Sequence, residues 1–193
     1  MPVENGREAI FTIGHSTREF GDFVKMLQGH AITLLVDIRT IPRSRHNPQF
    51  NKETIGKALG AQKIGYLHME ELGGLRKARH DSINTGWRNA SFRGYADYMQ
   101  TGDFEAGIEK LILLGKKEKV AIMCAEGNPF RCHRSLVADA LVTKGVMVMH
   151  ISSPASASAH VVTKFAKVHG TRVTYPGTGI AATDKKLAKL AGD

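Results

Sequence analysis

Short apolar runs alternate with amphipathic stretches along most of this chain, and this alternation constrains the fold more than any other feature. Five runs have the length of buried strands, at 9–13, 32–38, 64–69, 120–123 and 146–151. Between them, apolar residues recur at helical spacing over 20–27, 52–61, 103–114 and 136–141. Strands that alternate with helices indicate an α/β fold, and continuously apolar strands are typical of a parallel sheet covered on both faces. We therefore predict a mainly parallel sheet of about five strands flanked by helices, a Rossmann-like three-layer arrangement.

The length of 193 residues favours a single domain. We expect residues 1–155 to form the α/β domain and residues 156–193 to form a basic C-terminal extension that packs on the domain or trails from it. Around and beyond that boundary we expect a loop over 154–159, a helix over 160–169, a strand over 172–175 and a helix over 185–190.

Composition excludes several classes of protein. A hydrophobic content of 42% with 23% charged residues is typical of a globular chain and excludes global disorder. No apolar run approaches the roughly 20 residues of a membrane-spanning helix, so we expect no membrane partner. The charged first residues do not resemble a secretory signal, and two cysteines cannot build a disulfide scaffold. We therefore expect a cytoplasmic protein.

The formal net charge of +9 favours an anionic partner, which would be a nucleic acid, a nucleotide or a phosphorylated metabolite. Residues 39–93 carry much of the excess, with 11 Lys and Arg against 4 Asp and Glu. The same segment contains four aromatic residues, and basic groups interleaved with aromatics can neutralise phosphates and stack on bases. Those four are Phe50, Tyr66, Trp87 and Phe92. A solvated basic surface around a long connection explains the charge equally well.

Polar and titratable side chains follow all five predicted strands. Ligands of open α/β sheets bind at the carboxyl ends of the strands, so these side chains are candidates for a site. They are His15 and Ser16, Asp37 and Arg39, His68 and Glu70, Cys124 and Glu126, and His150 and Ser152. His15 is a candidate general base, although hydrogen bonds to neighbouring loops explain a histidine there equally well. Asp37 and Arg39 lie on the same side of one strand, where they either pair or face a ligand.

The stretch from Cys124 to Arg134, CAEGNPFRCHR, leaves one predicted strand, turns at Gly-Asn-Pro and enters a helix. A helix N-terminus binds anions readily, and Arg131 and Arg134 add bidentate donors. The same surroundings favour the thiolate form of Cys132. A buried structural role competes with a functional role for both cysteines.

Three chemical interpretations of this stretch can be compared. A phosphatase- or rhodanese-like loop does not fit well, because six residues separate Cys124 from Arg131, one too many. A zinc site would use Cys124, Cys132 and His133 with a fourth ligand such as His150, but the Cys-x-x-Cys spacing of structural zinc sites is absent. A redox pair of the two cysteines needs Cα atoms within about 7 Å. We assign no metal ligand and no cofactor from the sequence.

Seven short motifs occur in a fixed order between about residue 10 and residue 152. They are Ile13-Gly14-His15-Ser16, Val36-Asp37-Ile38-Arg39, Pro42-x-Ser44-Arg45, Phe50-Asn51, Leu72-Gly73-Gly74, Phe92-Arg93-Gly94-Tyr95, and Cys124-Ala125-Glu126 with Cys132-His133-Arg134. Together they resemble the motifs of domain of unknown function family 488. The resemblance implies a compact α/β domain of bacterial or archaeal type, and it implies no particular reaction, although the polar motifs look like those of an enzyme.

Our leading hypothesis is a small α/β enzyme that holds a phosphate-bearing substrate, a nucleotide or a nucleic acid, at the strand ends. The catalytic candidates are Cys124, Cys132, Glu126 and His15. The anion- and substrate-binding candidates are Ser16, Asp37, Arg39, Ser44, Arg45, Arg93, Tyr95, Arg131, His133 and Arg134. The alternatives are a non-catalytic nucleic-acid-binding protein that uses residues 39–93, and a metal-dependent protein.

Overall fold

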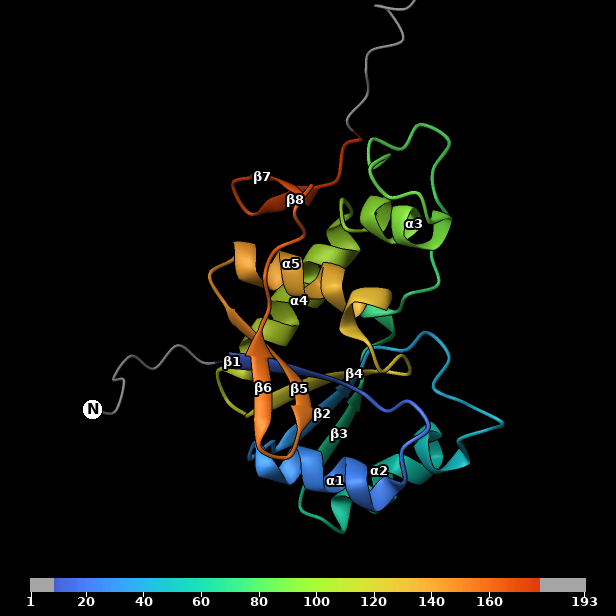
Figure 1. Cartoon of the computed structure of the whole chain (residues 1–193), viewed down its shortest axis with the longest axis vertical. Helices are drawn as coiled ribbons and strands as arrows, with labels where there is room; N and C mark the ends of the chain where they lie inside the picture. The colour runs from blue at the N-terminus through green and yellow to red at the C-terminus, as the bar shows by residue number, and fades with distance from the viewer. Residues whose placement is uncertain (1–8, 178–193) are drawn as a thin grey trace, which may run out of the picture.

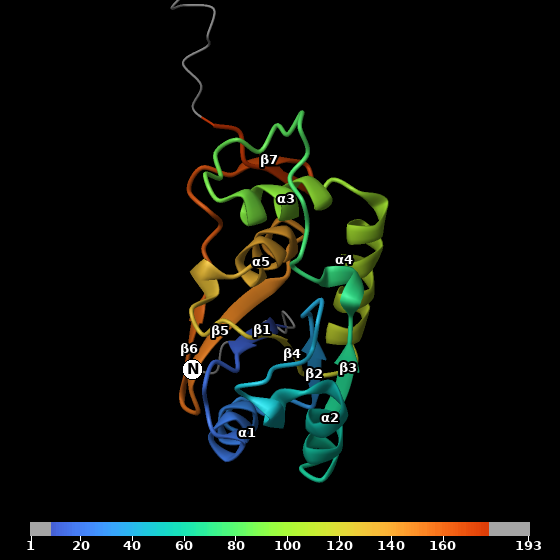
Figure 2. The same ribbon diagram turned by 90° about the vertical axis from the view of Figure 1, so that its right-hand side faces the viewer.

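The computed structural model describes residues 9–177 and shows a six-stranded sheet between two layers of helices (Figures 1 and 2). The strand order is β3-β2-β4-β1-β5-β6. The five parallel strands are β1 (Ala9–Gly14), β2 (Leu34–Asp37), β3 (Gly65–His68), β4 (Val120–Cys124) and β5 (Met147–Ser153). The predicted α/β fold with a mainly parallel sheet is confirmed.

Five α-helices cover the two faces of this sheet. Helices α1 (Phe20–Gly29) and α2 (Lys52–Gly60) lie on one face, and α3 (Ala90–Tyr98), α4 (Gly102–Gly115) and α5 (Arg134–Thr143) lie on the other (Figures 1 and 2). Successive side chains of a strand point to opposite faces, so each strand contributes to two cores. In β1, Ile10 packs with the α4 and α5 layer, whereas Phe11 and Ile13 pack with the α1 layer. Burial on both faces explains why the strands are continuously apolar.

Two predictions for the C-terminal part are wrong. Residues 154–159, expected to be a loop, include the strand β6 (Ser156–Ala159), which pairs antiparallel with β5. Small polar residues carry little strand propensity, so this strand depends on the free edge of β5 rather than on its own sequence. Residues 160–169, expected to be a helix, are irregular and end in β7 (Lys167–His169). The Asp139 carboxylate accepts hydrogen bonds from His160 and from the Thr163 N–H, which hold this backbone in a non-helical form.

The strand predicted over 172–175 is confirmed as β8 (Arg172–Thr174), which pairs with β7. The helix predicted over 185–190 lies outside the described residues. Within residues 9–177, no helix combines the length and the apolar character needed to cross a bilayer.

The long connection between β3 and α3 is held in place by one buried carboxylate. Asp97 of α3 accepts hydrogen bonds from the Arg79 N–H, the Ser82 hydroxyl and the Asn84 amide. Asn89 caps the start of α3 by accepting bonds from two backbone N–H groups. The connection is therefore fixed on α3, and it carries Gly74 and Leu75 to the carboxyl ends of the strands.

Candidate active site

Two adjoining cavities lie at the carboxyl ends of the parallel strands. The first, which we call the cysteine cavity, has a volume of about 360 Å³ and is lined by Cys124, Cys132 and His133 among others. The second, the His15 cavity, has a volume of about 470 Å³. Arg39 and Glu126 line both, so the two cavities share part of their walls, and we refer to them together as the cleft. Volumes in this range suit a small-molecule ligand.

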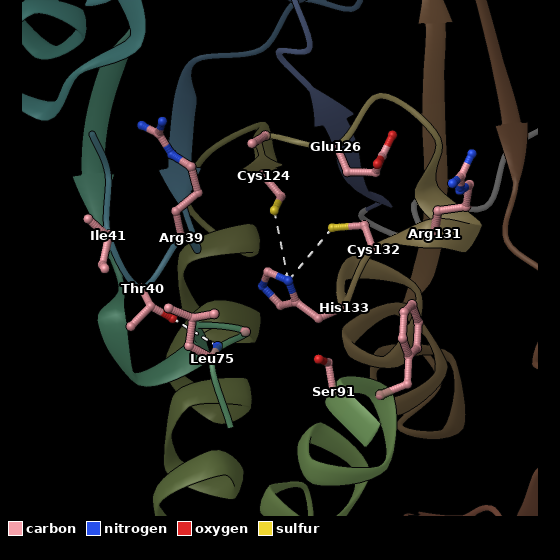
Figure 3. Close-up of a pocket in the computed structure, with 13 residues that line it drawn as sticks. Arg39, Thr40, Ile41, Leu75, Ser91, Cys124, Glu126, Arg131, Cys132 and His133 are labelled. Carbon is pink, nitrogen blue, oxygen red and sulfur yellow. Dashed lines mark hydrogen bonds between the residues drawn. The ribbon is translucent and has the colours of Figure 1, made fainter. Parts of the chain in front are cut away.

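Three side chains form what we call the Cys–Cys–His cluster in the wall of the cysteine cavity. Cys124 ends β4, while Cys132 and His133 immediately precede α5. The Nδ1 atom of His133 lies 3.8 Å from the Cys124 sulfur and 3.7 Å from the Cys132 sulfur. Figure 3 shows both sulfur atoms directed toward the His133 ring. Both cysteines are free thiols.

The His133 ring is fixed by contacts on its far side. Its Nε2 atom lies 3.0 Å from the Ile38 carbonyl oxygen, which can only accept, so Nε2 carries the proton and donates. In the neutral ring, Nδ1 therefore presents its lone pair to the two sulfurs. The Tyr95 ring packs 5.0 Å from the imidazole, and Gly74 lies close enough that a Cβ there would be 2.5 Å from Nδ1.

The two thiols share their protons unequally. The pKa of Cys132 is lowered, because the Cys124 thiol hydrogen-bonds to its sulfur and because His133 and Arg134 lie nearby. The pKa of Cys124 is raised, because it is the donor in that pair and because burial disfavours a second thiolate. The pair therefore favours a state with one thiol, Cys124, and one thiolate, Cys132, over a state with two thiolates.

An ion pair at the end of β2 presents Arg39 to both cavities. The Arg39 Nη2 atom lies 2.6 Å from Asp37 Oδ2, and Asp37 also accepts a 2.7 Å hydrogen bond from the Tyr66 hydroxyl. Asp37 is fully buried and lines neither cavity, so its side chain contacts Arg39 and Tyr66 rather than a ligand. Arg39 also lies 3.3 Å from His15 Nε2, while His15 Nδ1 donates to the Ser16 carbonyl at 2.8 Å. Burial lowers the pKa of His15, which keeps the ring neutral.

Arg134 supports the 124–132 loop from behind. Its side chain is 1% exposed, and Nη2 donates to the Glu126 and Gly127 carbonyl oxygens at 2.5 and 3.3 Å. Its Nη1 atom donates to the Thr12 hydroxyl at 3.2 Å. The loop also packs tightly on β1, because a Cβ at Gly14 would lie 1.9 Å from the Glu126 carbonyl oxygen. Arg134 therefore positions the loop and lines neither cavity.

A buried chain of hydrogen bonds continues from Arg134, and we call it the Arg134–Asp139 chain. Thr12 lies 2.7 Å from His150 Nδ1, His150 Nε2 lies 2.9 Å from His160 Nδ1, and His160 Nε2 lies 2.8 Å from Asp139. With the carboxylate accepting at one end and the guanidinium donating at the other, every contact is satisfied when Thr12 donates to His150, His150 to His160, and His160 to Asp139. Burial and the nearby His160 and Arg134 lower the pKa of His150 to about 4.

The structure brings most of the predicted site residues to the cleft. Those that line it are Cys124, Cys132, Glu126, His15, Ser16, Arg39, Ser44, Arg131 and His133. Five others do not line either cavity: Asp37, Arg45, Arg93, Tyr95 and Arg134.

The residues outside the cleft have other contacts. Arg93 donates to the Trp87 carbonyl oxygen, and the fully buried Tyr95 donates to that of Leu72. Arg45 is exposed on the loop that follows β2. His150, the fourth zinc ligand considered above, uses both ring nitrogens in the Arg134–Asp139 chain and lies outside the cluster.

Sequence reasoning missed part of the cleft wall. Thr40, Ile41, Leu75 and Ser91 line the cysteine cavity, and Ile41 and Leu75 are 64% and 69% exposed. The adjacent Gly73-Gly74 pair was the available signal, since a glycine pair marks a close approach of backbone to another group.

The fold and the cleft define a three-layer α/β protein with a cavity at the strand ends, the place where such folds commonly bind ligands. The family model described as "Domain of unknown function DUF488" matches residues 19–141. The chain belongs to this family, as the ordered motifs indicate. Neither the search of curated proteins nor that of solved structures gave a match.

Proposed function

We propose that this protein is an enzyme that acts on a phosphate-bearing small molecule of nucleotide size, with the Cys–Cys–His cluster as its reactive centre. The observation that carries the proposal is the convergence of Cys124, Cys132 and His133 in the wall of a cleft that also exposes Arg39 and Arg131. Perturbed titratable groups gathered in the main concave site of an α/β fold are typical of an active site.

Positive charge in and behind the cleft supports an anionic substrate. Arg131 is exposed and lines the cysteine cavity, and Arg43, whose guanidinium lies 3.6 Å from Glu53, lines the His15 cavity. Arg134 adds a buried positive charge whose side-chain hydrogen bonds go to neutral oxygens. Arg39 is neutralised by Asp37, so Arg131 is the residue we assign to direct contact with the phosphate.

Glu126 is the better of the two acid–base candidates. It is exposed, lines both cavities, and accepts one hydrogen bond at 3.2 Å from the Asn128 N–H. Both nitrogens of His15 already have partners, Ser16 and Arg39. We therefore assign proton transfer to Glu126 and the positioning of Arg39 to His15.

Three of the four aromatic residues of the basic segment favour a small substrate over a nucleic acid, and the fourth, Phe92, lines the cysteine cavity. Phe50 is fully buried and stacks on His15, and the Tyr66 hydroxyl is bound to Asp37. Trp87 packs against Tyr175 and other rings. Bases stack on exposed rings, so these three side chains do not offer a platform for single-stranded nucleic acid.

Calorimetric titration of the full chain with nucleoside mono-, di- and triphosphates and with pyrophosphate tests the proposal. We expect at least one compound to bind, and Arg131→Gln to weaken it about 10-fold or more, the effect of losing one charged hydrogen bond. Arg172→Gln, which removes an exposed arginine from β8, is the matched control and should leave binding unchanged. The proposal would be overturned if Arg131→Gln bound with the same affinity as the wild type. It would also be overturned if only oligonucleotides bound, with a steep salt dependence.

A further inference from the structure

We infer that the Cys–Cys–His cluster is a metal site for one divalent ion of the zinc class. The ligand atoms are Cys124 Sγ, Cys132 Sγ and His133 Nδ1, and the fourth coordination position opens into the cysteine cavity. The site itself stands on the geometry of these three residues. Only its use in catalysis rests on the proposed function.

The spacing of the three atoms suits a tetrahedral ion. With Zn–S near 2.3 Å and Zn–N near 2.0–2.1 Å, neighbouring sulfur and nitrogen ligands lie about 3.6 Å apart, and two sulfurs about 3.8 Å apart. The two observed nitrogen-to-sulfur distances are 3.8 and 3.7 Å, and all three atoms lie within 4.8 Å of one another. The nitrogen-to-sulfur distances therefore need shifts of only about 0.1–0.2 Å, and the two sulfurs, at most 4.8 Å apart, need to approach each other by at most about 1 Å.

The imidazole is oriented as a metal ligand requires. A ligating histidine commonly donates its other ring N–H to a carbonyl or carboxylate, which fixes the tautomer and the ring plane. His133 does this through Nε2 to the Ile38 carbonyl oxygen at 3.0 Å. The contacts of Nδ1 in the described residues are the two sulfurs, so its lone pair is available to an ion.

Charge balance favours a divalent ion over bare thiolates. Two thiolates side by side in a mostly buried place repel each other, and burial penalises both. A divalent ion carries two positive charges and would neutralise two such thiolates. Cys132 is 5% exposed and Cys124 is half-buried, so the neutral assembly suits the site better than two separate charges.

The cluster offers three protein ligands in the described part of the chain, and the number of ligands distinguishes structural from catalytic zinc sites. Structural zinc sites have four protein ligands, whereas catalytic sites have three and keep one position for water or substrate. All three ligands line the cysteine cavity together with Glu126 and Arg131. An ion there would polarise an oxygen of the bound substrate or lower the pKa of a bound water.

Loading the reduced full chain with Co²⁺ after treatment with a chelator tests the site without any substrate. We expect one equivalent to bind, with sulfur-to-cobalt charge-transfer absorption and the intense visible bands of a four-coordinate ion. Zinc should displace the cobalt. We expect each of three ligand variants to weaken metal binding: Cys124→Ser, Cys132→Ser and His133→Gln. The loss should exceed the roughly 10–100-fold that follows when a residue in contact with a metal ligand is changed. His169→Gln, which changes an exposed histidine of β7, should bind as the wild type does.

Three results would overturn the metal site: substoichiometric binding by the reduced wild type, a cobalt spectrum without sulfur ligation, or binding that survives all three ligand variants. Formation of a Cys124–Cys132 disulfide with no metal uptake would identify a redox pair instead. If the variants fail to fold, protection of both wild-type thiols from alkylation by one equivalent of metal, reversed by chelator, decides the question. Nucleotide binding through Arg131 is measured separately, so failure of the metal site and failure of the proposed function are distinguishable.

Discussion

Gly74 and His133 are 59 positions apart in the sequence, yet a Cβ on Gly74 would lie 2.5 Å from His133 Nδ1. The long connection after β3 therefore presses its backbone against the imidazole that faces the two cysteines. Together with the bond from Nε2 to Ile38, this contact sets where the His133 lone pair points. A residue that never touches an ion thus helps to determine whether the cluster can bind one.

Gly74→Ala should weaken metal binding while it leaves all three ligands in place. The added methyl group displaces the His133 ring, and disturbance of an outer contact typically lowers metal affinity about 10–100-fold. Competition against a chromophoric chelator measures the change. Gly21→Ala is the control, because the added Cβ in α1 meets nothing within 4 Å. Equal affinity in the two variants would show that the contact with Gly74 does not position His133.

Substitutions of Arg134 and of Arg131 should differ in their effect on the free energy of unfolding, although the two residues are only three positions apart. Arg134→Met should lower the free energy of unfolding by about 2–4 kcal/mol, because it removes a buried side chain that donates to the Glu126 and Gly127 carbonyl oxygens and to the Thr12 hydroxyl. Arg131→Met, at an exposed position, should change it by less than about 0.5 kcal/mol. Urea denaturation near neutral pH provides the comparison. Similar losses for both would contradict the assignment of Arg134 to loop support and of Arg131 to substrate.

Acid should destabilise the protein through His150. Its pKa is about 4 in the folded state and near 6.5 in the unfolded chain, so the unfolded state binds the proton first. Stability is therefore lost as pH falls from about 6.5 to 4, by roughly 1–3 kcal/mol from this group. The lowered pKa of His15 acts in the same direction.

Urea denaturation at several pH values measures this slope, and His150→Gln should reduce it without abolishing it, since His15 still titrates. A slope of the same size in His150→Gln would contradict the lowered pKa of His150.

Asp139 should be the most sensitive position of that chain. Asp139→Asn removes the charge that accepts from His160, Thr163 and Tyr175, and breaking such a buried network should lower the free energy of unfolding by about 3–5 kcal/mol. Tyr175→Phe removes one of these bonds and should reduce it by about 1 kcal/mol. Thermal denaturation ranks the two variants. The reverse order would show that the carboxylate does not organise the chain.

The fold was largely predictable because its dominant signal is local. Strands buried on both faces are continuously apolar, and apolar residues recur every three to four positions in helices with one buried face, so the five parallel strands and the helices α1, α2, α4 and α5 could be located from the sequence. The helix α3 was not predicted, because it follows a long stretch with little periodicity. β6 could not be predicted, because its Ser/Ala residues become a strand only through the free edge of β5. The hydrogen bond between His150 and His160 depends on that same hairpin and was missed with it.

The site was predictable in its location and less so in its geometry. The strand-end rule places Cys124, Arg39 and Glu126 at one edge of the sheet, as the structure does. Whether a side chain points into the cleft or makes its contacts behind the cavity wall depends on tertiary packing. Asp37 and Arg134 occupy motif positions, yet both make their contacts behind the cavity wall.

X-ray absorption at the zinc edge of the zinc-loaded full chain tests the central claim most directly. The account predicts two sulfur scatterers near 2.3 Å and a shell of nitrogen or oxygen scatterers near 2.0–2.1 Å, from Cys124, Cys132 and His133 with one further light atom. A first shell of nitrogen and oxygen alone, or zinc that fails to stay bound, would contradict it.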